Sequence, residues 1–169
     1  MPSAALSRSS ESLSPAMALA LAPEHPLLQQ AREQARARQL AYGGEVTPAQ
    51  AWDLLSERAA VLVDVRTAEE RKFVGYVAGS VHVPWQLGTA MQTNPRFVRE
   101  LESKLAKDTP ILMLCRSGAR SAAAALAATH AGFKHVFTVI EGFEGDLDEN
   151  RQRGRRGGWR YRALPWIQD

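Results

Sequence analysis

The chain has 169 residues, a mass of 18.6 kDa and a formal net charge of +3, which suits one domain with short appendages. Hydrophobic residues make up 45% and charged residues 23% of the sequence, a balance that excludes wholesale disorder. The longest uncharged apolar run near the N-terminus, Ala16 to Ala22, is too short to span a bilayer. The single cysteine, Cys115, excludes an internal disulfide, a CxxC redox pair and a zinc site built on several thiolates.

The N-terminal residues are rich in serine, alanine and proline, so we expect a disordered leader over residues 1–24. Ala20-Leu21-Ala22 fits the small-residue pattern of a signal-peptide cleavage site, but Arg8 is the only positive charge in the sequence before it. A secretory signal is therefore the weaker interpretation, and we expect a cytoplasmic protein that does not bind membranes. The apolar spacing of residues 25–41 predicts an N-terminal helix.

The following segments alternate short apolar runs with helix-like stretches. Thr47 followed by Pro48 is typical of the start of a helix, and residues 67–70 (TAEE) form a capping box that predicts a second, short helix. Two more helices are expected, from Asn94 to about Lys107 and from Ser121 to Ala131. Strands are predicted at four apolar runs: Ala60–Val65, Val81–Val83, Ile111–Leu114 and Val136–Ile140.

The predicted strands contain continuous rather than alternating apolar residues, which is typical of a parallel sheet covered on both sides. We therefore place the chain in the α/β class, with an open, twisted, mainly parallel sheet flanked by helices on both faces. Ligands of such sheets bind beyond the carboxyl ends of the strands. Cys115 directly follows the run Ile111–Leu114, so we expect its thiol at that edge.

The segment with the clearest chemistry is Leu114 to Ser121 (LCRSGARS), in which a thiol precedes a glycine-containing loop and a serine able to cap the next helix. A tight loop that enters a helix turns several backbone N–H groups inward and forms an anion-binding nest. The helix N-terminus adds partial positive charge, and Arg116 and Arg120 add full charges. These features favour thiolate over thiol and would hold an anionic substrate against the sulfur. A lone cysteine after a strand is more often a small buried hydrophobe, but two neighbouring guanidinium groups argue against an inert core position.

The run CRSGARS, residues 115–121, resembles the active-site loop of the rhodanese family of sulfurtransferases. Further segments resemble the pattern of this family in the same order: Val63 to Arg66 with Glu69-Glu70, Gly75 to Pro84, Gly132-Phe133, Val136, and Ile140 to Phe143. The resemblance covers about residues 44–145. The sequence departs from the pattern at Tyr76 and His82, where the family has His and Asn, and at the closing glycine pair, which is Gly142-Phe143 here.

The resemblance implies a rhodanese-like domain over residues 42–146 and a two-step sulfur transfer through a persulfide on Cys115. Thiosulfate or a related small anionic donor would supply the sulfane sulfur, and cyanide or a thiol would accept it. The loop N–H groups would hold the anionic sulfur and the arginines would recruit the donor. The substrate-binding residues would thus be Arg116, Ser117, Gly118, Ala119, Arg120 and Ser121. No metal or organic cofactor is required, and we expect a monomer.

Several residues outside the loop receive structural interpretations. Asp64 and Arg66 are expected to tie the end of a strand to the turn at Glu69-Glu70, since polar residues at strand ends are usually structural partners. His82 is expected to be a satisfied structural histidine. The C-terminal extension, residues 147–169, lies outside the family pattern, and we expect its tryptophans to pack on the domain.

Three alternatives stay open. Cysteine phosphatases share this kind of fold but use a C-x5-R loop, whereas Cys115 and Arg120 form a C-x4-R loop, one residue too short to surround phosphate with the same N–H groups. A non-enzymatic rhodanese-like persulfide carrier or regulatory interaction module would keep the fold without turnover. The six arginines within residues 151–162 resemble an RNA-contacting tail. Five acidic residues within 141–149 precede them, and no wider basic patch exists, so we expect no nucleic-acid partner.

Overall fold

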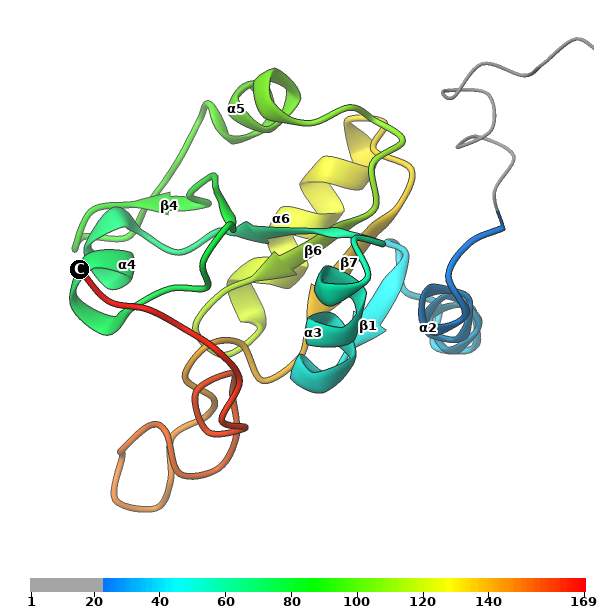
Figure 1. The fold of residues 1–169 in the computed structure, drawn as a ribbon. Coiled ribbons are helices and arrows are strands. Elements are labelled where there is room, and N and C mark those ends of the chain that lie inside the picture. Colours follow the sequence, from blue (N-terminus) through cyan, green and yellow to red (C-terminus); the bar gives the residue numbers. More distant parts are fainter. Residues whose placement is uncertain (1–22) are drawn as a thin grey trace, which may run out of the picture.

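A computed structural model describes residues 23–169. The predicted leader, with the Ala20-Leu21-Ala22 pattern, lies outside this range except for its last two residues. The central strands are β1 (Gly44–Val46), β2 (Val61–Asp64), β3 (Val81–His82), β6 (Ile111–Leu114) and β7 (Val136–Val139). They form one sheet in the order β1-β7-β6-β2-β3, and every pair in it is parallel (Figure 1). The structure therefore confirms the predicted α/β class with its mainly parallel sheet.

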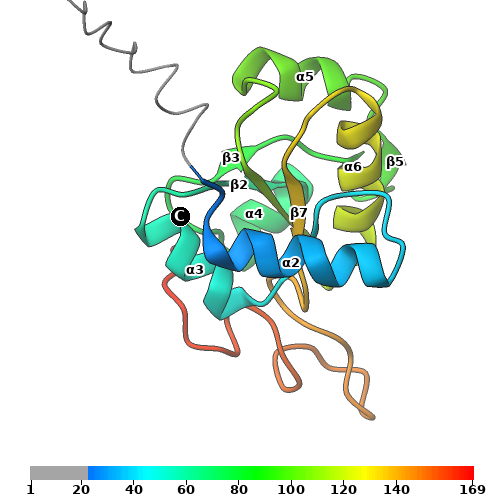
Figure 2. The ribbon, with the colours of Figure 1, turned by 90° about the vertical axis from the view of Figure 1, so that its right-hand side faces the viewer.

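Helices flank the sheet on both faces, as predicted (Figures 1 and 2). The flanking helices are α2 (Pro26–Ala37) and α3 (Pro48–Ser56) on one face, and α5 (Phe97–Lys104) and α6 (Ala119–His130) on the other. Successive strand residues point to opposite faces, so Leu112 and Leu114 join the core under α2 and α3, while Ile111 and Met113 join the core under α5 and α6. Burial on both faces explains the continuous apolar runs.

Several predicted helix boundaries are wrong, among them the end of α5, which lies at Lys104 and not near Lys107. The N-terminal helix α2 ends at Ala37 and does not continue to residue 41, because Gln39 adopts a left-handed backbone with φ of 57°. Helix α5 begins at Phe97 instead of Asn94. The Asn94 side chain accepts a hydrogen bond from the N–H of Arg96 at 3.0 Å, and this local turn competes with helix formation.

Short elements complete the fold. The three-residue strand β1 pairs with β7 at the sheet edge, with Gly44 opposite Phe137. This strand was not predicted, because three residues are too few to show a hydrophobic period. Helix α4 (Ala68–Val74) follows β2, and the pair β4 (Gln86–Leu87) and β5 (Gln92–Thr93) forms a separate antiparallel ribbon. No helix among residues 23–169 combines the length and the apolar character needed to cross a membrane.

The C-terminal residues return to the domain. Trp159 is fully buried, its ring lies 6.2 Å from that of Trp52 in an edge-on arrangement, and its Nε1 donates to the carbonyl of Pro165 at 2.9 Å. Ile167 exchanges two backbone hydrogen bonds with Tyr76, at 2.8 and 2.9 Å. The chain end is therefore held against the segment that follows α4.

The acidic residues of 141–149 and the arginines of 151–162 form ion pairs with each other. Three arginines of residues 151–162 form ion pairs with acids of residues 141–149: Arg155 with Asp148, Arg156 with Glu149, and Arg162 with Glu141. Half of the six arginines of residues 151–162 are thus paired with acidic side chains of residues 141–149.

Candidate active site

Cys115 lies directly after β6, at the carboxyl edge of the sheet. Its side chain is 1% exposed and contacts the apolar core under α5 and α6. The sulfur nevertheless has polar neighbours: Sγ accepts a hydrogen bond from the N–H of Gly118 at 3.1 Å and donates one to Oγ of Ser121 at 3.4 Å. A backbone amide therefore points at the sulfur from the loop, and the thiol lies at the base of that loop.

The loop turns into helix α6 at Gly118, which is the N-cap residue and has φ of 122°. This backbone conformation favours glycine because a side chain would be strained there. The prediction that Ser121 caps the helix is wrong, because the turn at Gly118 starts the helix at Ala119 and leaves Ser121 in its first turn. The Ser121 hydroxyl instead donates to the carbonyl of Gly118 at 2.8 Å. Ser121 thus links the sulfur to the start of the helix.

Arg120 points toward Glu70 in α4 and forms a two-pronged ion pair with it. Both guanidinium nitrogens, Nη1 and Nη2, lie 2.7 Å from a carboxylate oxygen of Glu70, and the two side chains are only 11% and 16% exposed. The same carboxylate accepts the N–H of Thr67 at 3.0 Å. The positive charge of Arg120 is therefore already balanced within the protein, which the loop sequence alone does not indicate.

The pKa of Glu70 follows from these contacts. Burial by itself raises it, but hydrogen bonds from Arg120 and from the N–H of Thr67 outweigh burial and hold the pKa below its ordinary value. Hydrogen bonds that favour the charged form of a carboxyl group lower its pKa. Glu70 is therefore ionised at neutral pH and keeps Arg120 in place.

The remaining loop residues differ in exposure and contacts. Arg116 is half-buried, and its Nε has no hydrogen-bond partner among residues 23–169. Its guanidinium forms no ion pair within that range either. Ser117 is half-buried, while Ala119 is exposed. Arg116 is thus the loop cation whose charge no acidic side chain of the described chain balances.

Asp64 and Arg66 form a fully buried ion pair at the end of β2. Arg66 donates to Asp64 through Nε at 3.0 Å and Nη2 at 2.7 Å, and Nη2 also donates to the carbonyl of Gly75 at 2.8 Å. The guanidinium carbon lies 4.1 Å from the centre of the Phe143 ring. The strand end is tied to α4 as expected, but through Arg71, whose Nη1 donates to Asp64 at 2.9 Å, and not through either glutamate. The Glu70 carboxylate binds Arg120, and Arg66 contacts Gly75 and Phe143.

His82 has a backbone partner: its Nε2 donates to the carbonyl of Arg66 at 2.8 Å. Burial lowers its pKa, although the hydrogen bond to Arg66 acts in the opposite direction. Neutral imidazole with a satisfied ring nitrogen is the ordinary state of a structural histidine.

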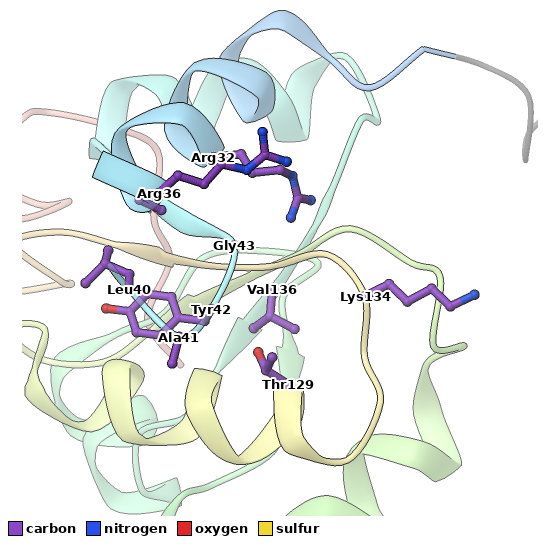
Figure 3. Close-up of a pocket in the computed structure, with 10 residues that line it drawn as sticks. Arg32, Arg36, Leu40, Ala41, Tyr42, Gly43, Thr129, Lys134 and Val136 are labelled. Carbon is purple, nitrogen blue, oxygen red and sulfur yellow. The ribbon is translucent and has the colours of Figure 1, made fainter. Parts of the chain in front are cut away.

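A surface cavity of about 260 Å³ lies at the opposite edge of the sheet from Cys115, between α2, the end of α6 and the start of β7 (Figure 3). Its basic groups do not converge on a ligand position. Arg32 is bound to Glu24 and His135, and Figure 3 shows Lys134 extending away from Arg32 and Arg36. Within residues 23–169, no group of three or more His, Cys, Asp or Glu side chains is arranged to hold a metal ion.

Comparisons with known proteins agree with this fold. Residues 47–149 match the model of the Rhodanese-like domain family. The chain therefore belongs to the rhodanese-like family. An uncharacterized protein of Rickettsia conorii is 35% identical over 118 residues, covering 67% of this chain and 87% of the relative.

Two further relatives connect the chain to an assigned activity and to a solved structure. The thiosulfate sulfurtransferase GlpE of Actinobacillus succinogenes is 33% identical over 101 residues, covering 60% of this chain and 81% of the relative. The crystal structure of Rv0390 from M. tuberculosis superimposes with a TM-score of 0.70 at 42% identity, covering 76% of this chain and 99% of that chain. Sulfurtransferases are thus among the relatives of this protein.

Proposed function

We propose that this protein is a sulfurtransferase that moves a sulfane sulfur from thiosulfate or a similar small anion to a thiophilic acceptor through Cys115. The observation that carries the proposal is the Gly118 N–H, which lies 3.1 Å from Sγ at the start of α6. An amide at a helix N-terminus stabilises an anion at that position, and a thiolate is the form of cysteine that reacts as a nucleophile. The likeness to GlpE supports the same activity.

In the first step, the Cys115 thiolate attacks the outer sulfur of thiosulfate. A new S–S bond forms, the S–S bond of thiosulfate breaks, and sulfite leaves with that electron pair. In the second step, cyanide or a thiolate attacks the terminal sulfur of the persulfide, and the Cys115 thiolate is regenerated. Loop N–H groups from Arg116 to Ser121 stabilise the anionic terminal sulfur, as an oxyanion hole stabilises developing charge.

The two loop arginines take different roles in this proposal. Arg116, whose guanidinium no acidic side chain of the described residues balances, attracts the anionic donor. Arg120 holds the start of α6 against α4 through its ion pair with Glu70. Donor affinity therefore depends more on the charge of Arg116 than on that of Arg120.

The direct test is sulfur transfer from thiosulfate to cyanide by the wild type and by Cys115→Ser. We expect thiocyanate from the wild type and none from the variant, which retains the size of the side chain without its nucleophile. Turnover of an aryl phosphate without sulfur transfer would contradict the proposal. A protein that forms the persulfide but does not pass the sulfur to cyanide or to small thiols would instead act as a carrier for a protein partner.

A further inference from the structure

Residues 141–145 lie directly against the Cys115 loop. Three backbone N–H groups of this segment donate to the carbonyls of Cys115 and Arg116, at distances of 2.8, 3.0 and 3.2 Å. Gly142 approaches the loop so closely that an added Cβ would lie 2.5 Å from the carbonyl carbon and oxygen of Arg116. No side chain separates the two segments there, so a displacement of residues 141–145 also displaces the backbone of Cys115, whose side chain carries the sulfur.

Residues 157–162 form a second layer on the other side of residues 141–145. Two of their N–H groups donate to carbonyls of that segment, at 2.8 and 3.2 Å. An added Cβ on Gly145 would lie 2.2 Å from the carbonyl oxygen of Gly157, so the two backbones are in direct contact. The fully buried Trp159 fixes this layer to the core. The family match ends at residue 149, so this second layer lies beyond the matched domain.

Glu141 joins the two layers through its side chain. Its carboxylate accepts Nε of Arg162 at 3.1 Å, Nη2 of the same residue, and the N–H of Gly158 at 3.0 Å. The hydrogen bond from Arg162 holds the pKa of Glu141 below its ordinary value, so the pair is charged at neutral pH. Glu141 adopts a left-handed backbone with φ of 67°, a conformation that glycine adopts without strain. Glutamate is strained at this position where glycine is not, but unlike glycine it has a side chain that binds the C-terminal segment.

We propose that Glu141 and Arg162 are positioning residues for the Cys115 loop, and that the C-terminal segment 157–162 is thereby part of the catalytic unit. The pair sets the placement of residues 141–145, which in turn set the direction of the Cys115 and Arg116 carbonyls and of the N–H groups that follow them. The consequence for catalysis rests on the proposed sulfur transfer, whereas the consequence for the geometry around the sulfur does not.

The single cysteine gives a test that does not depend on turnover, because alkylation of the native protein reports only on Cys115. The rate with anionic iodoacetate, divided by the rate with neutral iodoacetamide, measures how well the loop stabilises the carboxylate of the reagent beside the sulfur, because the reactivity of the thiolate itself cancels in the ratio. The variants are Glu141→Gly, which removes the side chain and relieves the left-handed backbone, and Arg162→Ala. The matched control is Arg156→Ala, which removes an exposed ion pair with Glu149 in the same C-terminal region.

We expect the iodoacetate to iodoacetamide ratio to fall about threefold or more in Glu141→Gly and Arg162→Ala, the effect of weakening a fraction of one hydrogen bond to the anion. We expect kcat/KM for thiosulfate to fall about tenfold in the same variants, chiefly in kcat, as small misplacements of reacting groups cause. Arg162→Lys, which retains the charge and one donor, restores part of both quantities. Arg156→Ala matches the wild type, and thermal unfolding verifies that every variant is folded.

A folded Glu141→Gly or Arg162→Ala protein with the wild-type alkylation ratio overturns the inference, whatever its stability. A wild type that does not transfer sulfur overturns the proposed function, and the alkylation ratios then still decide whether the pair positions the loop. An equal fall in the ratio for the Arg156→Ala control also overturns the inference, because the effect would then come from loss of any C-terminal ion pair.

Discussion

Replacing Glu70 by glutamine is expected to destabilise the protein by removing the charge that Arg120 faces. Glutamine retains one oxygen acceptor but cannot form the two charge-assisted bonds, each 2.7 Å long, that join the guanidinium to the carboxylate. The side chains are 11% and 16% exposed, so solvent replaces the lost partner poorly. Hydrogen bonds to charged groups contribute about 1.5–3 kcal/mol, and we expect a loss of about 2 kcal/mol in the free energy of unfolding.

The effect has a defined pH dependence. The pKa of Glu70 in the folded protein lies below its ordinary value, so its contribution to stability is fully present above the ordinary pKa and is lost as the pH falls through the folded pKa. The difference between the wild type and Glu70→Gln is therefore greatest at neutral pH and shrinks below about pH 4. Urea unfolding followed by tryptophan fluorescence measures it, and the unfolding temperature falls by roughly 4–8 °C for this loss in a domain of this size.

Glu149→Gln is the matched control, since Glu149 pairs with Arg156 on the surface and exposed pairs contribute little. We expect this variant to unfold with the free energy of the wild type. If the free energy of unfolding of Glu70→Gln lies within about 0.5 kcal/mol of the wild type at neutral pH, the range of ordinary surface substitutions, the ion pair does not stabilise the protein. A loss of stability that does not change with pH would show that the effect does not come from the carboxylate charge.

Other substitutions test the support beneath the loop. Gly142→Ala places a Cβ 2.5 Å from the Arg116 carbonyl, and we expect overpacking to lower the free energy of unfolding by about 1–3 kcal/mol. The control is Gly154→Ala, whose Cβ would have nothing within 4 Å, so that only the penalty of its positive φ applies. Equal losses of the two variants in urea unfolding would show that the close contact at Gly142 has no effect. Arg66→Met leaves the buried carboxylate of Asp64 with one cationic partner fewer. We expect this variant to lose about 3–5 kcal/mol in the free energy of unfolding. A loss below about 1 kcal/mol would show that the remaining contacts suffice.

The sequence predicts four of the five strands of the sheet and the edge at which Cys115 lies, because the evidence for them is local, whereas the short edge strand β1 was not predicted. Each buried strand is an apolar run, and the position of Cys115 after Ile111–Leu114 is enough to place the thiol at the carboxyl edge of a parallel sheet. Thr47 and Thr67 mark helix starts by hydrogen bonds within three residues. The capping box predicted at residues 67–70 forms, and Thr47, predicted to cap α3, forms a second box with Gln50.

The contacts that support the loop are not local and could not be read from the sequence. Glu70 is a capping-box residue by its spacing, yet its carboxylate also binds Arg120, fifty residues later. Arg66 reaches Phe143 through the tertiary fold. The early start of α6 depends on the positive φ of Gly118, a backbone property that glycine permits but does not require. Tertiary packing determines these contacts, and the local sequence pattern does not.

The intact mass of the protein after treatment with thiosulfate shows whether Cys115 carries sulfur as a persulfide. We expect the wild type to gain one sulfur atom, which proteolysis locates on the peptide with Cys115 and dithiothreitol removes, and we expect Cys115→Ala to gain none. A wild-type protein whose mass stays unchanged, while its thiol still reacts with iodoacetamide, would show that Cys115 does not accept the sulfane sulfur of thiosulfate.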